Sequence, residues 1–212
     1  LTSLEEHPEW DEEQRGNLLG ECYLIQSFLM YNDIRAMSRL HRSASRQMSR
    51  PAISIRSSGG WTFGSPSVLM MFYRAPGELA AELSEMDECM PHYYKITNGH
   101  GQGAETIMCA EAAFLQGRFT DAQIALERAY AQIEGNGQEN MALCCDFLEL
   151  RLSLCTEAAL RQSMEERRAQ LLRQHNAAWL NLWDAACAYY AALLMQEARI
   201  PPLFAEHRLS SV

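Results

Sequence analysis

The stretch AEAAFLQGRFTDAQIALERAYAQIE, residues Ala110 to Glu134, decides how this chain folds. Its first half is rich in small residues and runs to Gly117, a residue type that readily takes the left-handed conformation at the end of a helix. Its second half places Ala122 and Ala129 seven residues apart, which keeps both on one helix face. Small residues there let two helices approach closely, and we expect Phe119 to plug the turn. The stretch therefore predicts an antiparallel helical hairpin.

The same signal recurs along the chain at a nearly constant spacing. Turns are expected near Asn32, Ala75, Gly117, Thr156 and Ala198, with gaps of 43, 42, 39 and 42 residues. Such a spacing is typical of stacked hairpins, in which each helix pair buries its apolar side against the next. We therefore expect an all-α fold, a right-handed superhelix of about four to five antiparallel hairpins forming one domain over residues 1–212.

One irregular connection, residues 48–64, interrupts this pattern. It is rich in Ser, Gly, Arg and Pro, and it carries Trp61 and Phe63. Large aromatic side chains in a loop tend to be packed down. They are expected either to wall a ligand pocket on the inner face of the superhelix or to fill the gap between two hairpins. Ser65 and Pro66 then match the N-cap and first residue of the next helix.

Composition restricts the classes of function. Hydrophobic residues make up 48% of the chain, which is enough for a core, and the formal net charge is −9. An acidic chain does not bind nucleic acid through its whole surface, because phosphate contacts need a basic face. No apolar run reaches the roughly 18 residues of a membrane span, and the acidic N-terminus shows no secretory signal. We expect a cytoplasmic protein whose seven cysteines are reduced, without a cofactor.

The turn at Gly117 resembles the central turn of the tetratricopeptide repeat. Gly117, Phe119, Ala122 and Ala129 occupy the glycine, aromatic and two alanine positions of that consensus. The proline that usually follows the second helix is missing, and Glu134 stands near its place. The period, about 40 residues, is longer than the 34 residues of that family.

These longer repeats are similar to those of the maltose-activator-like branch of LuxR-family transcription regulators. Three stretches resemble that branch, residues 31–39, 61–69 and 85–101. In that family the repeats lie between an ATPase module and a helix-turn-helix domain, and they bind an inducer or a regulatory protein. The chain contains no GxxxxGK[ST] phosphate loop. The resemblance implies that this is the middle of a longer regulator, which contacts DNA only through a domain outside this chain.

A row of arginines is the main basic feature of the sequence. It comprises Arg35, Arg39, Arg42, Arg46 and Arg50, spaced 4, 3, 4 and 4 residues apart. This spacing lines one helix face and favours a docking surface for an acidic partner, a nucleotide phosphate or a neighbouring domain. The alternative is a solvated face that pairs with the acidic N-terminus, residues 5–12.

Weaker candidates for ligand binding lie between residues 93 and 103. Tyr93, Tyr94 and His100 carry polar groups suited to a small ligand. The glycine-rich run Asn98 to Gly103 precedes an expected helix, where free N–H groups attract anions. Its spacing matches no phosphate motif, so a simple connection between helices is the alternative.

Metal and enzymatic sites find little support. Cys89 and His92 share a helix face, but a metal site needs more ligands at set spacing, so none is expected. No GxSxG motif occurs. An all-α enzyme that uses acids such as Asp87 and Glu88 stays a remote alternative.

The expected function is ligand sensing or protein docking by a repeat module of a regulator, without catalysis. The expected partner is a small-molecule effector or a regulatory protein, and self-association into a homo-oligomer stays open. The alternative is a stand-alone tetratricopeptide scaffold that binds a peptide or protein.

Overall fold

The computed structural model describes residues 10–30, 32–56, 66–153, 157–175, 177–196, 200 and 204. All regular secondary structure in these residues is helical and none of it is a strand, which confirms the all-α prediction. The chain divides into two compact units, Leu1–Asp146 and Phe147–Val212, and helix α8 (Glu139–Leu152) crosses the boundary between them.

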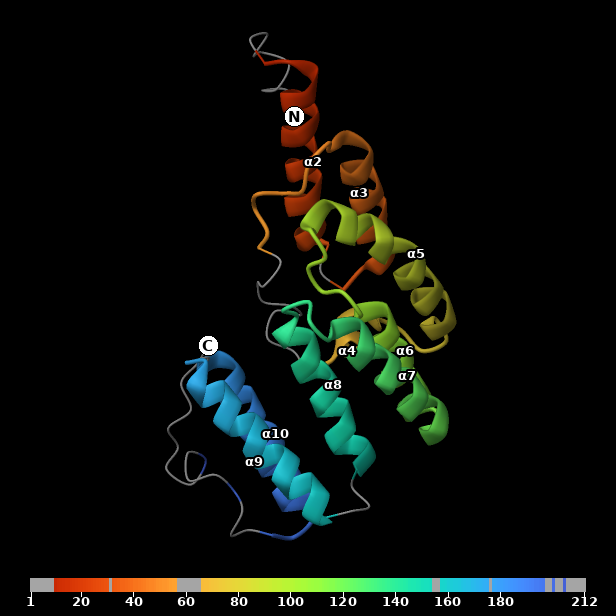
Figure 1. Ribbon diagram of the computed structural model, residues 1–212. Helices are drawn as coiled ribbons and strands as arrows, with labels where there is room; N and C mark the ends of the chain where they lie inside the picture. Colours follow the sequence, from red (N-terminus) through yellow and green to blue (C-terminus); the bar gives the residue numbers. More distant parts are fainter. Residues whose placement is uncertain are drawn as a thin grey trace. The chain divides into compact units, whose positions relative to one another are not determined.

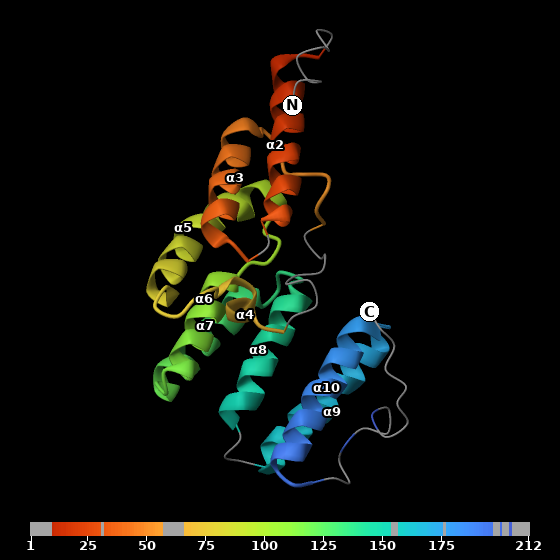
Figure 2. The same ribbon diagram turned by 180° about the vertical axis from the view of Figure 1, so that it is seen from behind.

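The first unit is built from the helices that precede α8. They are α2 (Glu12–Leu29), α3 (Ile34–Gln47), α4 (Val68–Phe72), α5 (Leu79–Thr97), α6 (Ala104–Leu115) and α7 (Phe119–Ile133). Helix α3 packs between α2 and α5, and α6 contacts α4, α5 and α7 (Figure 1, Figure 2). Local hairpins therefore join into one core through α3 and α6.

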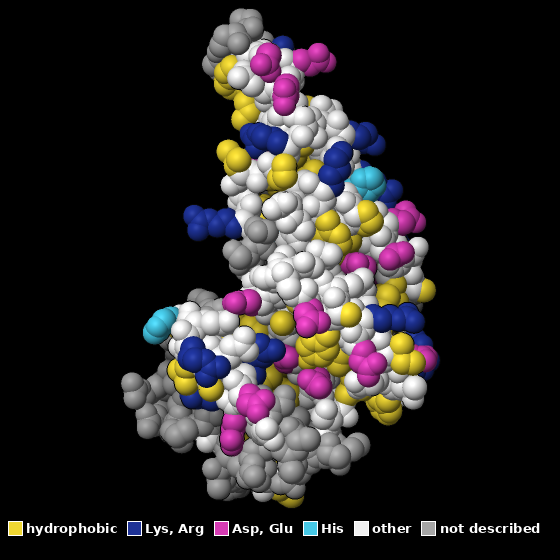
Figure 3. All heavy atoms as spheres, in the orientation of Figure 1, with side chains coloured by type: hydrophobic (Ala, Val, Ile, Leu, Met, Phe, Trp, Pro, Cys, Tyr) yellow, Lys and Arg dark blue, Asp and Glu magenta, His cyan; other side chains and the backbone are white. Residues whose placement is uncertain are grey.

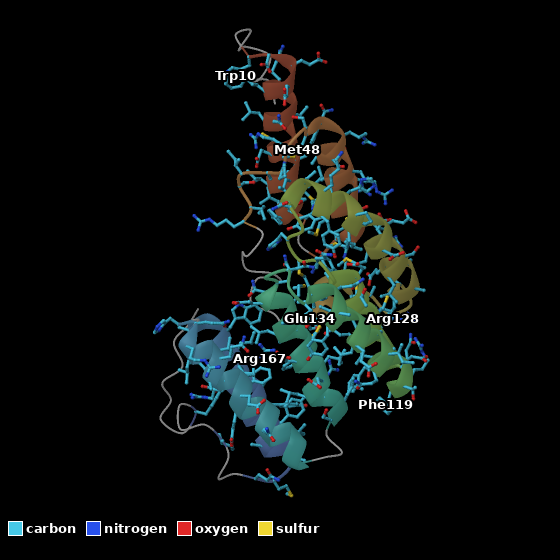
Figure 4. All side chains as sticks on the ribbon, in the orientation of Figure 1. Trp10, Met48, Phe119, Arg128, Glu134 and Arg167 are labelled. Atoms are coloured by element: carbon cyan, nitrogen blue, oxygen red, sulfur yellow. The ribbon has the colours of Figure 1, made fainter. Side chains whose placement is uncertain are left out.

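Helices α2 and α3 approach closely because glycine faces the contact. A methyl group at Gly16 would lie 2.7 Å from the carbonyl oxygen of Gln47, and one at Gly20 would lie 2.0 Å from Cγ of Met48. Met48, at the end of α3, lies against α2 (Figure 4). The turn between the two helices contains Asn32, with φ of 59°. The two glycines thus set the distance between the helices.

The hairpin of α6 and α7 shows why its sequence is rich in alanine. Ala122 and Ala129 of α7 are 0% exposed, and Gly117 between the helices has φ of 74°. The expectation for Phe119 is wrong: it is 58% exposed and lies at the outer end of α7, in contact with the ring of Phe114 (Figure 4). It is the first residue of its helix and follows the end of α6, so α6 covers only part of its ring.

Around Ala75 the structure differs from the sequence expectation, because α4 packs mainly on α6 and does not form a hairpin with α5. Ser67, rather than Ser65, caps α4 and accepts a hydrogen bond from the Met70 amide at 3.1 Å. Ser65 lies outside the described residues. Helix α5 runs from Leu79 to Thr97 and contains Pro91 in its interior.

The second unit contains α9 (Glu157–Arg173) and α10 (Ala177–Leu193), which pack on each other. Arg168 of α9 donates two hydrogen bonds to Asp184 of α10, at 2.7 and 3.0 Å. The indole of Trp183 donates to the carbonyl of Met164 at 3.0 Å. The turns expected at Thr156 and Ala198 lie outside the described residues.

Substituting Gly16 by Ala tests the close approach. At an ordinary helix position this change stabilises a protein by about 1 kcal/mol. Here the new methyl would meet backbone, which cannot rotate away, so we expect a loss of about 1–3 kcal/mol in the free energy of unfolding. Denaturant titration followed by circular dichroism measures it. Gln26→Ala, on the exposed side of α2, is the control and should leave stability unchanged or slightly raised; a Gly16→Ala protein as stable as the wild type would contradict the packing.

Candidate functional site

Helix α3 carries a buried face and a basic face. Its buried residues include Ile34, Met37, His41 and Ala44, which recur with helical spacing. Its arginines, Arg35, Arg39, Arg42 and Arg46, recur with the same period on the other side. The helix starts at the N-cap Asp33, whose side chain accepts a hydrogen bond from the Ala36 amide at 3.0 Å. Because α2 and α5 hold the buried face, the arginines are directed toward solvent (Figure 3).

One of these arginines, Arg42, joins α3 to α5 through ion pairs. The Arg42 guanidinium lies 2.7 Å from Glu85 and 3.3 Å from Glu88, both on α5. Beside it, the Lys95 ammonium donates to the carbonyl of Ser45 at 3.0 Å. Within the described residues Arg42 therefore pairs with α5, and not with the acidic N-terminus as the sequence alternative had it.

The other three arginines of α3 are open. Arg35, Arg39 and Arg46 are exposed, and no carboxylate of the described residues forms an ion pair with them. Arg46 donates only to the hydroxyl of Ser43, at 3.3 Å. We call Arg35, Arg39 and Arg46 the α3 basic face.

Arg50 does not belong to this face, because α3 ends before it. Its guanidinium lies 3.7 Å from Glu21 and donates to the carbonyl of Pro51 at 3.0 Å. It lines a surface cavity of about 330 Å³, together with Trp10, Gln14, Asn17 and Leu18. Trp10 stands beside the start of α2 (Figure 4).

The cavity combines the apolar Trp10 and Leu18 with polar side chains and one partly exposed cation, Arg50, which also pairs with Glu21. Asn17 is occupied by Ser49: its amide nitrogen donates to the hydroxyl at 3.0 Å, and its oxygen accepts from the Ser49 amide at 3.0 Å. The Arg50 side chain keeps 43% of its surface exposed. An indole, a Leu side chain and a guanidinium suit a small anion with an aromatic or apolar part. Sequence patterns gave no reason to combine Trp10 with Arg50, which lie forty residues apart.

A buried polar cluster lies beneath the arginines, between α2, α3 and α5. Nε2 of His41 is 2.9 Å from the Ser27 hydroxyl, and its Nδ1 is 3.2 Å from the sulfur of Cys89. The Ser27 hydroxyl donates its only hydrogen to the carbonyl of Leu24 at 2.6 Å, so it accepts from His41. The second imidazole nitrogen is then left to accept the Cys89 thiol hydrogen. This arrangement requires a neutral imidazole and a neutral thiol.

Burial maintains both neutral forms. Burial, together with the smaller effect of the nearby His92, lowers the pKa of His41 to about 3. Burial also raises the pKa of the Cys89 thiol to about 12, although the Ser38 hydroxyl acts in the opposite direction. The cluster is therefore an internal hydrogen-bonded core, with no reactive thiolate.

The tyrosines and histidine expected to meet a ligand belong to this interior. Tyr93 is 2% exposed and its hydroxyl lies 2.8 Å from Nδ1 of His100, which is 5% exposed. The Tyr93 ring also contacts the His41 ring in a tilted arrangement, with centroids 4.7 Å apart. The hydroxyl of Tyr94 bonds to Glu105 and accepts from the Gly103 amide at 3.1 Å. None of the three side chains lines the cavity.

The glycine-rich run is a tight connection whose polar groups are occupied. Gln138 donates to the carbonyl of Gly99 and accepts from the amide of Gly101, each at 3.0 Å. Asn98 and the glycines adopt positive φ, which lets the chain turn sharply between α5 and α6. Trp61 and Phe63, the other expected ligand residues, lie outside the described residues.

Other classes of site are limited by what the described residues contain. They hold no group of three or more side chains able to bind a metal ion. Their cysteines are free, Cys22 and Cys109 being exposed and the other four buried. None of the helices in this part of the chain has the length and apolar character to cross a membrane. Comparison with protein-family models, curated proteins and solved structures gave no match for this chain.

The neutral state of His41 predicts a dependence of stability on pH. Its folded pKa, about 3, lies below the unfolded value of 6.5, so the unfolded chain takes up a proton first as the pH falls. The stabilisation is complete above pH 6.5 and decreases below it. Between pH 7 and pH 5 we expect the free energy of unfolding of the wild type to fall by about 2 kcal/mol more than that of the His41→Gln protein. Urea titrations at both values measure this; His175→Gln, an exposed position, should behave as the wild type, and a His41→Gln protein with the same loss would contradict the assignment.

Proposed function

We propose that this chain is a docking module of a larger regulator, which binds an acidic protein segment through the α3 basic face. The observation that carries the proposal is the placement of Arg35, Arg39 and Arg46, exposed and without ion pairs among the described residues, on one side of one helix. Arginine forms bidentate hydrogen bonds with carboxylates and does so in a fixed geometry.

The charge of the whole chain supports an oriented contact. With a net charge of −9, most of the surface repels an acidic partner. The α3 basic face is a local exception, so it steers such a partner to one place and one orientation.

The contacts that hold α3 on α5 favour binding as well. The ion pairs of Arg42 with Glu85 and Glu88 join α3 to α5, and the bond from Lys95 to Ser45 joins them again. A helix held in this way does not have to be ordered on binding, which lowers the entropic cost of association.

Ligand sensing is the second candidate, and the cavity beside Trp10 favours it. A small anion bound there would contact α2 and, through Arg50, the segment that follows α3. Such a ligand stabilises the arrangement of the first hairpin that it fits best. We propose an effector with an aromatic or apolar part and a carboxylate or phosphate.

The wider setting rests on the resemblance to LuxR-family regulators. In that setting the hairpins continue as a right-handed superhelix, an ATPase module and a helix-turn-helix domain flank them, and the module itself has no catalytic role. The gene sequence on both sides of this chain tests it, since a scaffold that works alone would lack both domains.

Binding of a fluorescein-labelled oligoglutamate peptide tests the docking proposal. We expect anisotropy to show binding that weakens as salt is added, because the contact is between exposed charges. Replacing Arg35, Arg39 and Arg46 by Gln should weaken it at least tenfold. The control replaces Arg118, Arg128 and Arg173, which are also exposed, by Gln and changes the net charge equally. Equal losses in both variants, or no binding by the wild type, would count against the proposal.

A thermal-shift screen tests the cavity. Aromatic carboxylates at millimolar concentration should raise the melting temperature, because a ligand that binds only the folded state stabilises it. Sugars without charge should not. Arg50→Gln should remove the shift, and Arg173→Gln should keep it. A shift that survives both Arg50→Gln and Trp10→Ala would place the ligand elsewhere.

A further inference from the structure

Helix α2 has a second apolar face, on the side away from α3. The residues it buries include Asn17, Gly20, Leu24 and Ser27. On the opposite side stand Leu18, Cys22, Ile25 and Leu29, all exposed, and Ile25 and Leu29 keep 53% and 77% of their surface in solvent. Figure 3 shows hydrophobic side chains at the surface of this end of the first unit. We call these four residues the α2 stripe.

The stripe has the spacing of a helix-pairing seam. Its residues follow one another at intervals of 4, 3 and 4. Intervals of three and four alternate where two helices pack along their length. Of the four, only Leu18 also lines the cavity, and the α3 basic face lies on another helix, so the proposed docking function leaves the stripe unexplained.

The intervals also read the same in both directions, and this indicates the partner. When a twofold axis relates two antiparallel helices, residue numbers rise along one helix where they fall along the other. A set of intervals that is the same in both directions therefore places each stripe residue opposite a stripe residue of the partner. Leu18 then lies opposite the partner subunit's Leu29, and Cys22 lies opposite the partner subunit's Ile25. All four layers pair apolar side chains. We propose that the α2 stripe is a homodimer interface, formed by antiparallel pairing with a second copy of this chain.

Charge selects the antiparallel direction over the parallel one. Helix α2 begins with Asp11, Glu12 and Glu13, whereas its last turn, Gln26 to Leu29, has no charged residue. Parallel pairing would bring these carboxylates of both copies together. Antiparallel pairing in this register keeps the two acidic ends apart, because each extends past the last turn of the partner helix, and it opposes the two helix dipoles.

The size of the stripe sets the expected strength. Four side chains from each copy bury less than the roughly 1,600 Å² of a standard interface. The association should therefore be weak and should depend on protein concentration. Sedimentation of the chain should show a dimer as its concentration approaches about millimolar. At that concentration an association free energy near −4 kcal/mol is detectable. Ile25→Glu should reduce its association constant at least tenfold, with an unchanged circular dichroism spectrum.

Disulfide trapping tests the register. Ile25→Cys puts a second thiol opposite the partner subunit's Cys22, so mild oxidation should give a dimer that reducing agent reverses. Gln26→Cys is the matched control, because it lies on the same exposed turn but off the stripe. Cys109, which is exposed, and Cys155, which lies outside the described residues, are replaced by Ser in every variant. We expect the Ile25→Cys protein to cross-link at least tenfold faster than the Gln26→Cys protein. It should also cross-link at least tenfold faster than the protein that keeps Ile25 and Gln26.

Three results would overturn the proposal. The first is a chain that stays monomeric throughout the concentration range. The second is equal cross-linking of Ile25→Cys and Gln26→Cys. The third is rapid cross-linking through Cys22 alone, which indicates parallel pairing. None of these measurements involves the α3 basic face, so their failure and that of the proposed docking function are distinguishable.

Discussion

The contact of α3 with its two neighbours is the constraint on which the rest of the first unit depends. On one side Gly16 and Gly20 let α2 approach until backbone and side chain touch. On the other, Arg42 and Lys95 tie α3 to α5. With both flanks occupied, α3 has only one free side, and that side carries Arg35, Arg39 and Arg46. The position of the basic face is thus a consequence of helix packing.

Helix α3 carries polar side chains in two environments, one buried and one exposed. His41 is removed from water, and Ser27 and Cys89 supply both of its hydrogen bonds, so the imidazole stays neutral. The arginines of the α3 basic face, a turn away, are exposed to water. A buried cation without a partner would cost far more than an exposed one. Burial, rather than residue type, separates the polar core from the α3 basic face here.

Sequence periodicity predicted the helices well because it reports which residues face inward. Ala122 and Ala129 had to lie together on one helix face, and Gly117 had to end a helix, whatever the rest of the chain did. Phe119 was misjudged because a consensus position says nothing of how far the neighbouring helix extends.

The sequence by itself determined the all-α class, the breaks between helices near Asn32, Ala75 and Gly117, and the alignment of the arginines on one face of α3. All of these follow from the order and spacing of residues along one stretch of chain. Only the tertiary structure decided which polar groups form hydrogen bonds or ion pairs with distant parts of the chain. It buried Tyr93 against His100, paired Arg42 with Glu85, and brought Trp10 beside Arg50. Those outcomes depend on contacts between residues far apart in the chain, whose distance and burial no local spacing encodes.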